Sequence, residues 1–168
     1  MFLAEIETAM EGARYHEAYA FELAHPTKAG IAQRSYHILI FHLRAYYWEL
    51  WSVWDYILQN ANANTLKLKR VDTNLVNEIS KKAPYYTFLA EITAIRDSPN
   101  LKRIARLRHS AHKFVLEPYQ VEINDKGVSV ISLHMRDKAV PDQVNVDRND
   151  LAFVEDAVQR LKNVGFFK

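Results

Sequence analysis

Residues 106–113, RLRHSAHK, carry the side chains of this chain that are best suited to chemistry. The stretch contains two arginines, one lysine and two histidines, and no carboxylate. Arginine binds phosphate through two parallel hydrogen bonds and stabilises negative charge that develops on it. Histidine has a pKa near neutrality and can accept or donate a proton. This combination suits a site where RNA is cleaved by its own 2′-hydroxyl, without a metal ion.

The periodicity of residues 101–115 predicts a helix that carries these side chains. Between Ser98 and Leu116 there are five Lys or Arg, two His and no acid. At about 100° per residue, one face of this helix is apolar, and it consists of Ile104, Leu107, Ala111, Phe114 and Val115. The opposite side should face solvent or a partner, and it consists of Lys102, Arg106, His109 and Lys113. Arg108 and His112 are four residues apart, so they should be neighbours along one edge of the apolar face.

Two alternatives explain the same residues without RNA. A basic helix can simply be solvated, with its charges favoured by the helix C-terminus. His109 and His112 form an HxxH pair that could supply two ligands to zinc. A metal ion needs further ligands, however, and no carboxylate or third histidine lies close in sequence. We therefore expect no metal ion and no cofactor at this helix.

The motif resembles that of the HEPN superfamily, in which an arginine is followed by four to six residues, usually beginning with a polar one, and then by a histidine. Ala111 and His112 also look like the Ala-His ending of this motif in members similar to abortive-infection proteins. The resemblance extends to the order of the predicted helices over most of the chain. Its specific part is confined to the helix at 101–115.

Three pairs of arginine and histidine match parts of this motif. Arg106 and His112 have five residues between them, but an apolar residue follows the arginine. Arg108 is followed by the polar His109, yet only three residues separate it from His112. Arg103 with His109 lacks the Ala-His ending. We expect His112 to be the histidine of the motif, and the choice between Arg106 and Arg108 stays open.

The resemblance implies a homodimer in which two motif helices meet and form one cleft. It also implies a metal-independent endoribonuclease that acts as a toxin or in phage defence, with a cognate antitoxin protein as a partner. His112 would be the general acid or base, and Arg106 or Arg108 would bind the scissile phosphate. His109 would support them, and further contacts with RNA are expected from Lys102, Arg103 and Lys113.

Two other classes of function remain open from the sequence. The first is a non-catalytic HEPN-like module that binds RNA, a nucleotide or a protein partner, which the imperfect spacing of the motif favours. The second is a structural helical protein whose basic helix is only surface. Cleavage of RNA in the presence of EDTA separates the enzyme from both.

The rest of the composition indicates one soluble domain. At 168 residues the chain is long enough to bury a core. Its formal net charge is +2, so any basic site must be local. The chain has no cysteine, which excludes disulfides and thiolate metal sites and fits a cytoplasmic protein. The N-terminus lacks a signal-peptide pattern, and the most apolar region, 38–57, is too interrupted by charges to span a membrane.

The sequence predicts an all-α fold in a single domain over residues 1–168. We expect an up-and-down, HEPN-like helical bundle of four to five helices with a small β-hairpin before the last helix. Alternation of apolar and polar residues predicts the hairpin at about 119–135. The helices are expected at 2–24, 29–59, 72–95, 101–115 and 147–164, with a loop at 60–64.

Local signals refine the predicted helix at 72–95 and its surroundings. Pro84 should kink this helix or split it, because proline cannot donate the helical hydrogen bond. Asp72 or Thr73 can cap its start, and residues 97–100 should form a turn and a cap before the basic helix.

The helix expected at 29–59 carries the second conspicuous feature, a row of aromatic rings. RNA bases can stack on such rings. The rings recur at the spacing of one helical stripe, however, so packing in the core or at a dimer seam is the simpler explanation. The stripe consists of Tyr47, Trp51, Trp54 and Leu58. His37 and His42, in the same helix, are expected to bond structural partners.

Overall fold

The computed structural model of the protein describes residues 2–23, 33–72, 74–113, 116–123, 129–135, 143–146 and 148–167. For residues 33–36, and for those between 110 and 145, the description covers the backbone alone. These parts form a mainly helical fold with a small sheet. Its elements are α1 Leu3–Leu23, α2 Gln33–Asn64, α3 Leu75–Lys82, α4 Leu89–Asp97, α5 Pro99–Lys113, β1 Leu116–Ile123, β2 Ser129–Met135, β3 Gln143–Val146 and α6 Asn149–Asn163.

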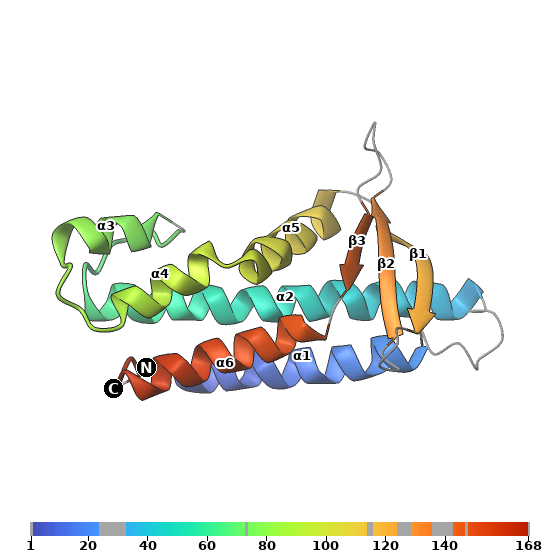
Figure 1. Ribbon diagram of the computed structural model, residues 1–168, viewed down its shortest axis with the longest axis horizontal. Coiled ribbons are helices and arrows are strands. Elements are labelled where there is room, and N and C mark those ends of the chain that lie inside the picture. Colours follow the sequence, from blue (N-terminus) through green and yellow to red (C-terminus); the bar gives the residue numbers. More distant parts are fainter. Residues whose placement is uncertain are drawn as a thin grey trace.

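Helices α1 and α2 run side by side in opposite directions along the length of the molecule (Figure 1). Helix α1 buries residues at three- and four-residue steps, among them Ile6, Met10 and Ala13. Helix α2 lies in the middle of the bundle, with α1 and α6 on one side and α5 on the other (Figure 1). Its apolar character on most sides follows from this position, and its buried side chains include Leu39, Leu43, Tyr46, Leu50, Trp54 and Ile57.

Helix α2 continues to Asn64, so the loop predicted at 60–64 is wrong. Asparagine usually favours turns because its amide competes with the backbone for hydrogen bonds. Here the amides bond groups outside the helix. Asn62 accepts from the Leu68 N–H at 2.8 Å and donates to the Leu68 carbonyl at 2.9 Å. The fully buried Asn60 donates to a backbone carbonyl near the C-terminus at 3.0 Å.

The predicted helix at 72–95 is split near Pro84, as expected, into α3 and α4. Asp72 accepts a backbone N–H at 2.8 Å just before α3, while Thr73 lies outside the described residues. Ser98 then caps α5, because its Oγ accepts the Leu101 N–H at 3.1 Å. The predicted cap is therefore confirmed, whereas the turn predicted at 97–100 is reduced to Ser98, because Asp97 ends α4 and Pro99 begins α5.

The sheet stands at the end of the bundle away from both chain ends (Figure 1). Strands β1 and β2 pair antiparallel, from Leu116 opposite Met135 to Ile123 opposite Ser129, with an irregularity after Pro118. They occupy the stretch where the sequence predicts a hairpin. Strand β3 lies in the largely polar stretch 136–146, where the sequence predicts no strand. It pairs antiparallel with β2. Pairing with a formed neighbour, not local propensity, makes this short strand.

Helix α6, which lies where the sequence predicts a helix at 147–164, packs an apolar stripe against the bundle, with Leu151, Val154, Ala157, Val158 and Leu161 buried. Surface ion pairs join it to α1: Arg14 Nη2 lies 2.7 Å from Glu155 Oε1, and Lys162 Nζ lies 3.0 Å from Glu7 Oε1. Within the described ranges, no helix combines the length and the apolar character needed to cross a bilayer.

Candidate functional site

Helix α5 presents its charged residues outward because its apolar residues are held in the core. Leu101, Ile104 and Leu107 are buried. Lys102, Arg106 and His109 lie on the other side of the helix and are exposed, as its periodicity predicts. The side chains of His112 and Lys113 lie outside the described part, although their backbone continues α5.

Arg103 is placed in an internal ion pair. Its Nε lies 3.1 and 3.2 Å from the two carboxylate oxygens of Asp150, and its Nη2 bonds the same carboxylate. Asp150 is fully buried and also accepts a hydrogen bond from the Tyr47 hydroxyl at 3.1 Å. Burial and the neighbouring Asp150 raise the pKa of Tyr47 well above its usual value, so Tyr47 remains a donor. Arg103 therefore joins α5 to α6 and α2, although the sequence had suggested an RNA contact.

Arg108 lies against the indole rings of α2. Its guanidinium carbon is 5.1 Å from the ring centroid of Trp48 and 5.5 Å from that of Trp51, within the range of cation–π attraction. Its Nε is shielded from solvent and finds no hydrogen-bond acceptor within the described residues. Two indoles thus restrict this arginine, while Arg106, two residues earlier, is exposed.

His109 is exposed, and a bond to its own helix fixes its tautomer. Its Nδ1 lies 2.6 Å from the carbonyl oxygen of Ala105. Because a carbonyl only accepts, Nδ1 carries the proton, and Nε2 is left with a lone pair in the neutral ring. The ring meets the edge of Trp51 at a centroid distance of 5.9 Å. His109 can therefore take up a proton or contact a ligand through Nε2.

Asp55 is a second carboxylate close to this basic helix, and its role was not predicted from the sequence. Burial raises the pKa of Asp55, whereas Arg108, a hydrogen bond from Trp51 and the charge of His109 lower it. The signal in the sequence was the four-residue step from Trp51 to Asp55, which places both on one face of α2. Asp55 holds negative charge close to Arg108 and His109.

The aromatic stripe of α2 is core, as expected: Tyr47, Trp51, Trp54 and Leu58 are all buried. Trp48 differs, since 47% of it is exposed. His42 bonds a structural partner, as expected, and His37 is exposed. His42 is buried, and its Nδ1 lies 2.9 Å from Nδ1 of His16, so one ring donates to the other.

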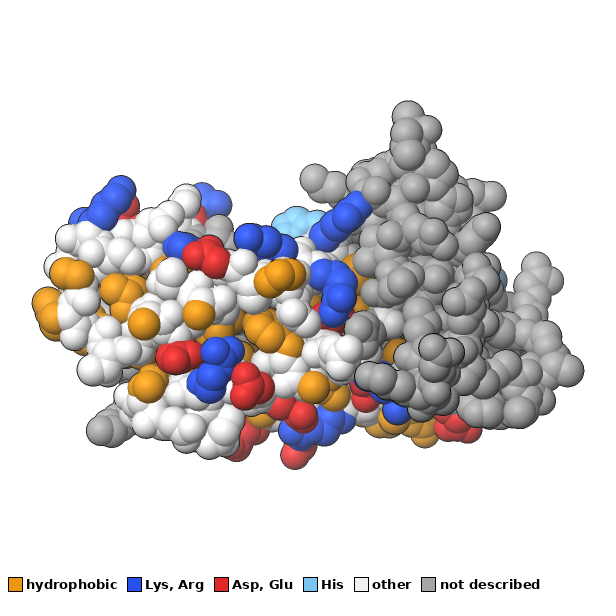
Figure 2. Space-filling view, in the orientation of Figure 1, with side chains coloured by type: hydrophobic (Ala, Val, Ile, Leu, Met, Phe, Trp, Pro, Cys, Tyr) orange, Lys and Arg blue, Asp and Glu red, His pale blue; other side chains and the backbone are white. Residues whose placement is uncertain are grey.

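Charge is distributed unevenly between the helices. Helix α5 carries five Lys or Arg and no acid, whereas α1 carries five Glu and one Arg. Figure 2 shows basic side chains along the edge formed by α5, and most acidic ones lower, over α6 and α1. No group of three or more potential metal ligands occurs among the described residues. The α5 edge is thus suited to anions.

The second feature missed from the sequence is the buried partner of Arg103. Asp150 lies four residues before Val154, on the apolar stripe of α6, where a charged side chain requires a partner. The position of Asp150 on the apolar stripe could therefore have indicated a buried ion pair from the sequence. In comparisons with known proteins, no protein-family model, no curated protein and no solved structure matches this chain.

Proposed function

We propose that the protein is a metal-independent endoribonuclease of the HEPN type, acting as a toxin or in phage defence. Helix α5 binds single-stranded RNA along its exposed basic side. His112 is the general acid or base, Arg106 binds the scissile phosphate, and His109 supports the reaction. Lys102 and Lys113 contact neighbouring phosphates. The fold is then an HEPN-like bundle in which two copies of α5 meet in a homodimer.

The observation that carries this proposal is the composition and exposure of α5. Lys102, Arg106 and His109 are exposed on a helix that has no carboxylate. Such a helix attracts the phosphate backbone by charge, independent of base sequence. The imidazole of His109 offers Nε2 for proton transfer at the same surface. Phosphate binding and proton transfer are the two operations that this reaction needs.

The surroundings of the two motif arginines favour Arg106 as the phosphate ligand. Arg108 is held against Trp48 and Trp51, so its guanidinium would have to leave two rings to reach a phosphate. Arg106 is exposed and has the five-residue spacing to His112 that the family motif allows. Arg108 then acts as a positioning residue that holds α5 on α2.

Cleavage by the 2′-hydroxyl needs a general base and a general acid, and in this proposal they are two imidazoles in opposite protonation states. One takes the proton from the 2′-hydroxyl, whose oxygen attacks the adjacent phosphorus. The bond from phosphorus to the 5′-oxygen breaks, and the second imidazole, in its protonated form, gives a proton to this leaving oxygen. Arg106 stabilises the charge on the pentavalent phosphate. The products are a 2′,3′-cyclic phosphate and a 5′-hydroxyl.

The test is cleavage of labelled single-stranded RNA by the purified protein in EDTA. We expect His112→Ala to abolish cleavage and Arg106→Ala to lower it by about 100-fold or more, since a charge-stabilising donor typically contributes this much. Arg14→Ala is the matched control, because Arg14 is half exposed and forms a surface ion pair with Glu155, away from α5. Full activity of His112→Ala would refute the mechanism.

A second candidate is a non-catalytic module that binds RNA, a nucleotide or a protein. The engagement of Arg103 by Asp150 and of Arg108 by the two indoles favours it, because α5 then has fewer arginines for a reaction. The same assay separates the two: binding of RNA that Arg106→Ala weakens, without cleavage products, would support the module.

A further inference from the structure

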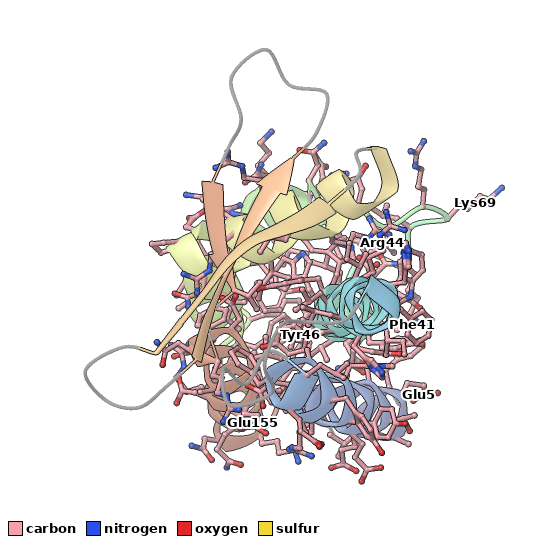
Figure 3. All side chains as sticks on the ribbon, turned by 90° about the vertical axis from the view of Figure 1, so that its right-hand side faces the viewer. Glu5, Phe41, Arg44, Tyr46, Lys69 and Glu155 are labelled. Carbon is pink, nitrogen blue, oxygen red and sulfur yellow. The ribbon has the colours of Figure 1, made fainter. Side chains whose placement is uncertain are left out.

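A groove of about 450 Å³ lies between α1 and α2, and the proposed RNA site does not use it. Its size falls within the range of about 300–1,000 Å³ that is usual for small-molecule sites. Figure 3 shows Glu5 on the flank of α1 turned away from Glu155 of α6, so the groove opens on the side that α6 leaves uncovered. It is lined by Ala4, Glu5, Thr8, Ala9, Trp48, Glu49, Ser52 and Tyr56.

The groove has aromatic walls and a floor of small residues. Trp48 is 47% exposed, and Tyr56 is half-buried and stacks on Phe2 at a centroid distance of 6.2 Å. The hydroxyls of Thr8 and Ser52 donate to carbonyls of their own helices, at 2.9 and 3.0 Å. The charged groups of the groove are therefore its two carboxylates.

Glu49 has no cationic partner among the described residues, and α1 makes room for its side chain. A Cβ at Gly12 would lie 3.1 Å from Cγ and Cδ of Glu49. Glycine is unfavourable inside a helix relative to alanine, so its use here indicates that the space matters. Burial raises the pKa of Glu49, and no Lys, Arg or His of the described part pairs with Glu49 or Glu5. A bound cation would supply the missing charge.

We propose that this groove binds a linear polyamine. Glu49 lies beside Gly12, and Glu5 is seven residues earlier on α1, so the two carboxylates are spaced by about 10 Å along the helix axis. A chain of methylenes between two ammonium groups can bridge this distance. The methylenes lie on Trp48 and Tyr56, and an ammonium over either ring gains cation–π attraction.

The chemistry of the groove argues against nucleic acid as its occupant. Two carboxylates repel phosphate, and α1 as a whole carries five Glu against one Arg, so its charge is negative. Trp48 thus borders two unlike surfaces, with Arg108 on the side of α5 and Glu49 on the side of α1. The polyamine site is independent of RNA cleavage and goes beyond the proposed function.

The experiment is an NMR titration of the intact protein with spermidine, read at the indole N–H of Trp48, which Trp48→Phe assigns. We expect a saturable shift with a Kd below about 1 mM. Glu49→Gln should weaken binding by about tenfold or more, and Gly12→Ala should weaken it as well, since the new methyl displaces Glu49. Glu17→Gln is the matched control, because Glu17 of α1 is a half-buried glutamate like Glu49 but lies near Arg148 and Glu155.

Further arms define the ligand and the carboxylates. Glu5→Gln removes the charge of the second, exposed carboxylate. It should weaken the binding of spermidine but change the binding of putrescine little, because the shorter diamine reaches only one carboxylate. Sodium chloride at matched ionic strength should give no saturable shift. An unaltered titration in Glu49→Gln, or an equal response to salt, would overturn the site. Tighter binding of a trilysine peptide than of spermidine would overturn the polyamine and assign a basic protein segment instead.

Discussion

The ion pair between Arg103 and Asp150 allows the sharpest test of how α5 is held. Replacement of Arg103 by methionine keeps an unbranched apolar stem of similar volume but removes the guanidinium and its charge. It leaves the carboxylate of Asp150, which is 0% exposed, with the hydrogen bond from the Tyr47 hydroxyl but without the guanidinium that balances its charge. An uncompensated buried charge is the main destabilising consequence.

The magnitude follows from the burial of the two partners. Removal of one partner of a buried pair costs about 3–5 kcal/mol in the free energy of unfolding. The side chain of Arg103 is 32% exposed, so water screens part of the interaction, and we expect a value near the lower limit, about 3 kcal/mol. For a chain of this size the melting temperature should fall by about 6–12 °C.

Urea unfolding followed by circular dichroism measures this loss as a lower midpoint at an unchanged slope. Arg106→Met is the matched control, and it should change stability by less than about 0.5 kcal/mol because Arg106 is exposed. The double variant Arg103→Met with Asp150→Leu should recover much of the stability, since no buried charge remains. A loss below about 0.5 kcal/mol in Arg103→Met would refute the reasoning.

Three further predictions concern other parts of the molecule. Burial and repulsion from His42 lower the pKa of His16, and burial lowers the pKa of His42. The unfolded chain therefore binds protons before the folded chain does as the pH falls below 6.5, so the free energy of unfolding should decrease there. Urea titrations at about pH 7.5 and 5.5 measure this decrease in the wild type, and it should be smaller in His16→Gln. Ser98→Ala should cost about 1 kcal/mol by removing the cap of α5, measured by thermal unfolding. Expression should arrest growth of host cells, and His112→Ala should relieve the arrest; growth equal for both proteins would contradict the toxin proposal.

The features that depend on near neighbours in the chain could be predicted from the sequence. The outward side of α5 follows from the spacing of Leu101, Ile104 and Leu107, and its start from a serine that precedes the helix. The break near Pro84 follows from the missing N–H of proline. Each of these signals acts within about one or two turns, so no knowledge of the fold was needed.

The features that depend on distant partners could not be predicted. Arg103 and Asp150 are 47 residues apart, and a one-dimensional pattern does not show that α6 brings a carboxylate to α5. The asparagines at 60–64 were misread for the same reason, since their partners lie outside the helix. Trp48 and Trp51 are three residues apart on α2, yet their different exposure, 47% and 8%, depends on which side faces the groove and which faces α5.

The open choice between the two motif arginines shows how the fold adds information to a motif. Helical geometry alone puts Arg108 nearer than Arg106 to the position of His112, because residues four apart lie on one flank and residues six apart are separated by about 120°. The spacing rule of the HEPN motif, which the sequence resembles, favours Arg106. Packing separates the two, since Arg108 lies against two indoles while Arg106 is exposed. If α5 pairs across a dimer, an exposed arginine can serve the histidine of the second copy, and the separation along one helix no longer excludes it.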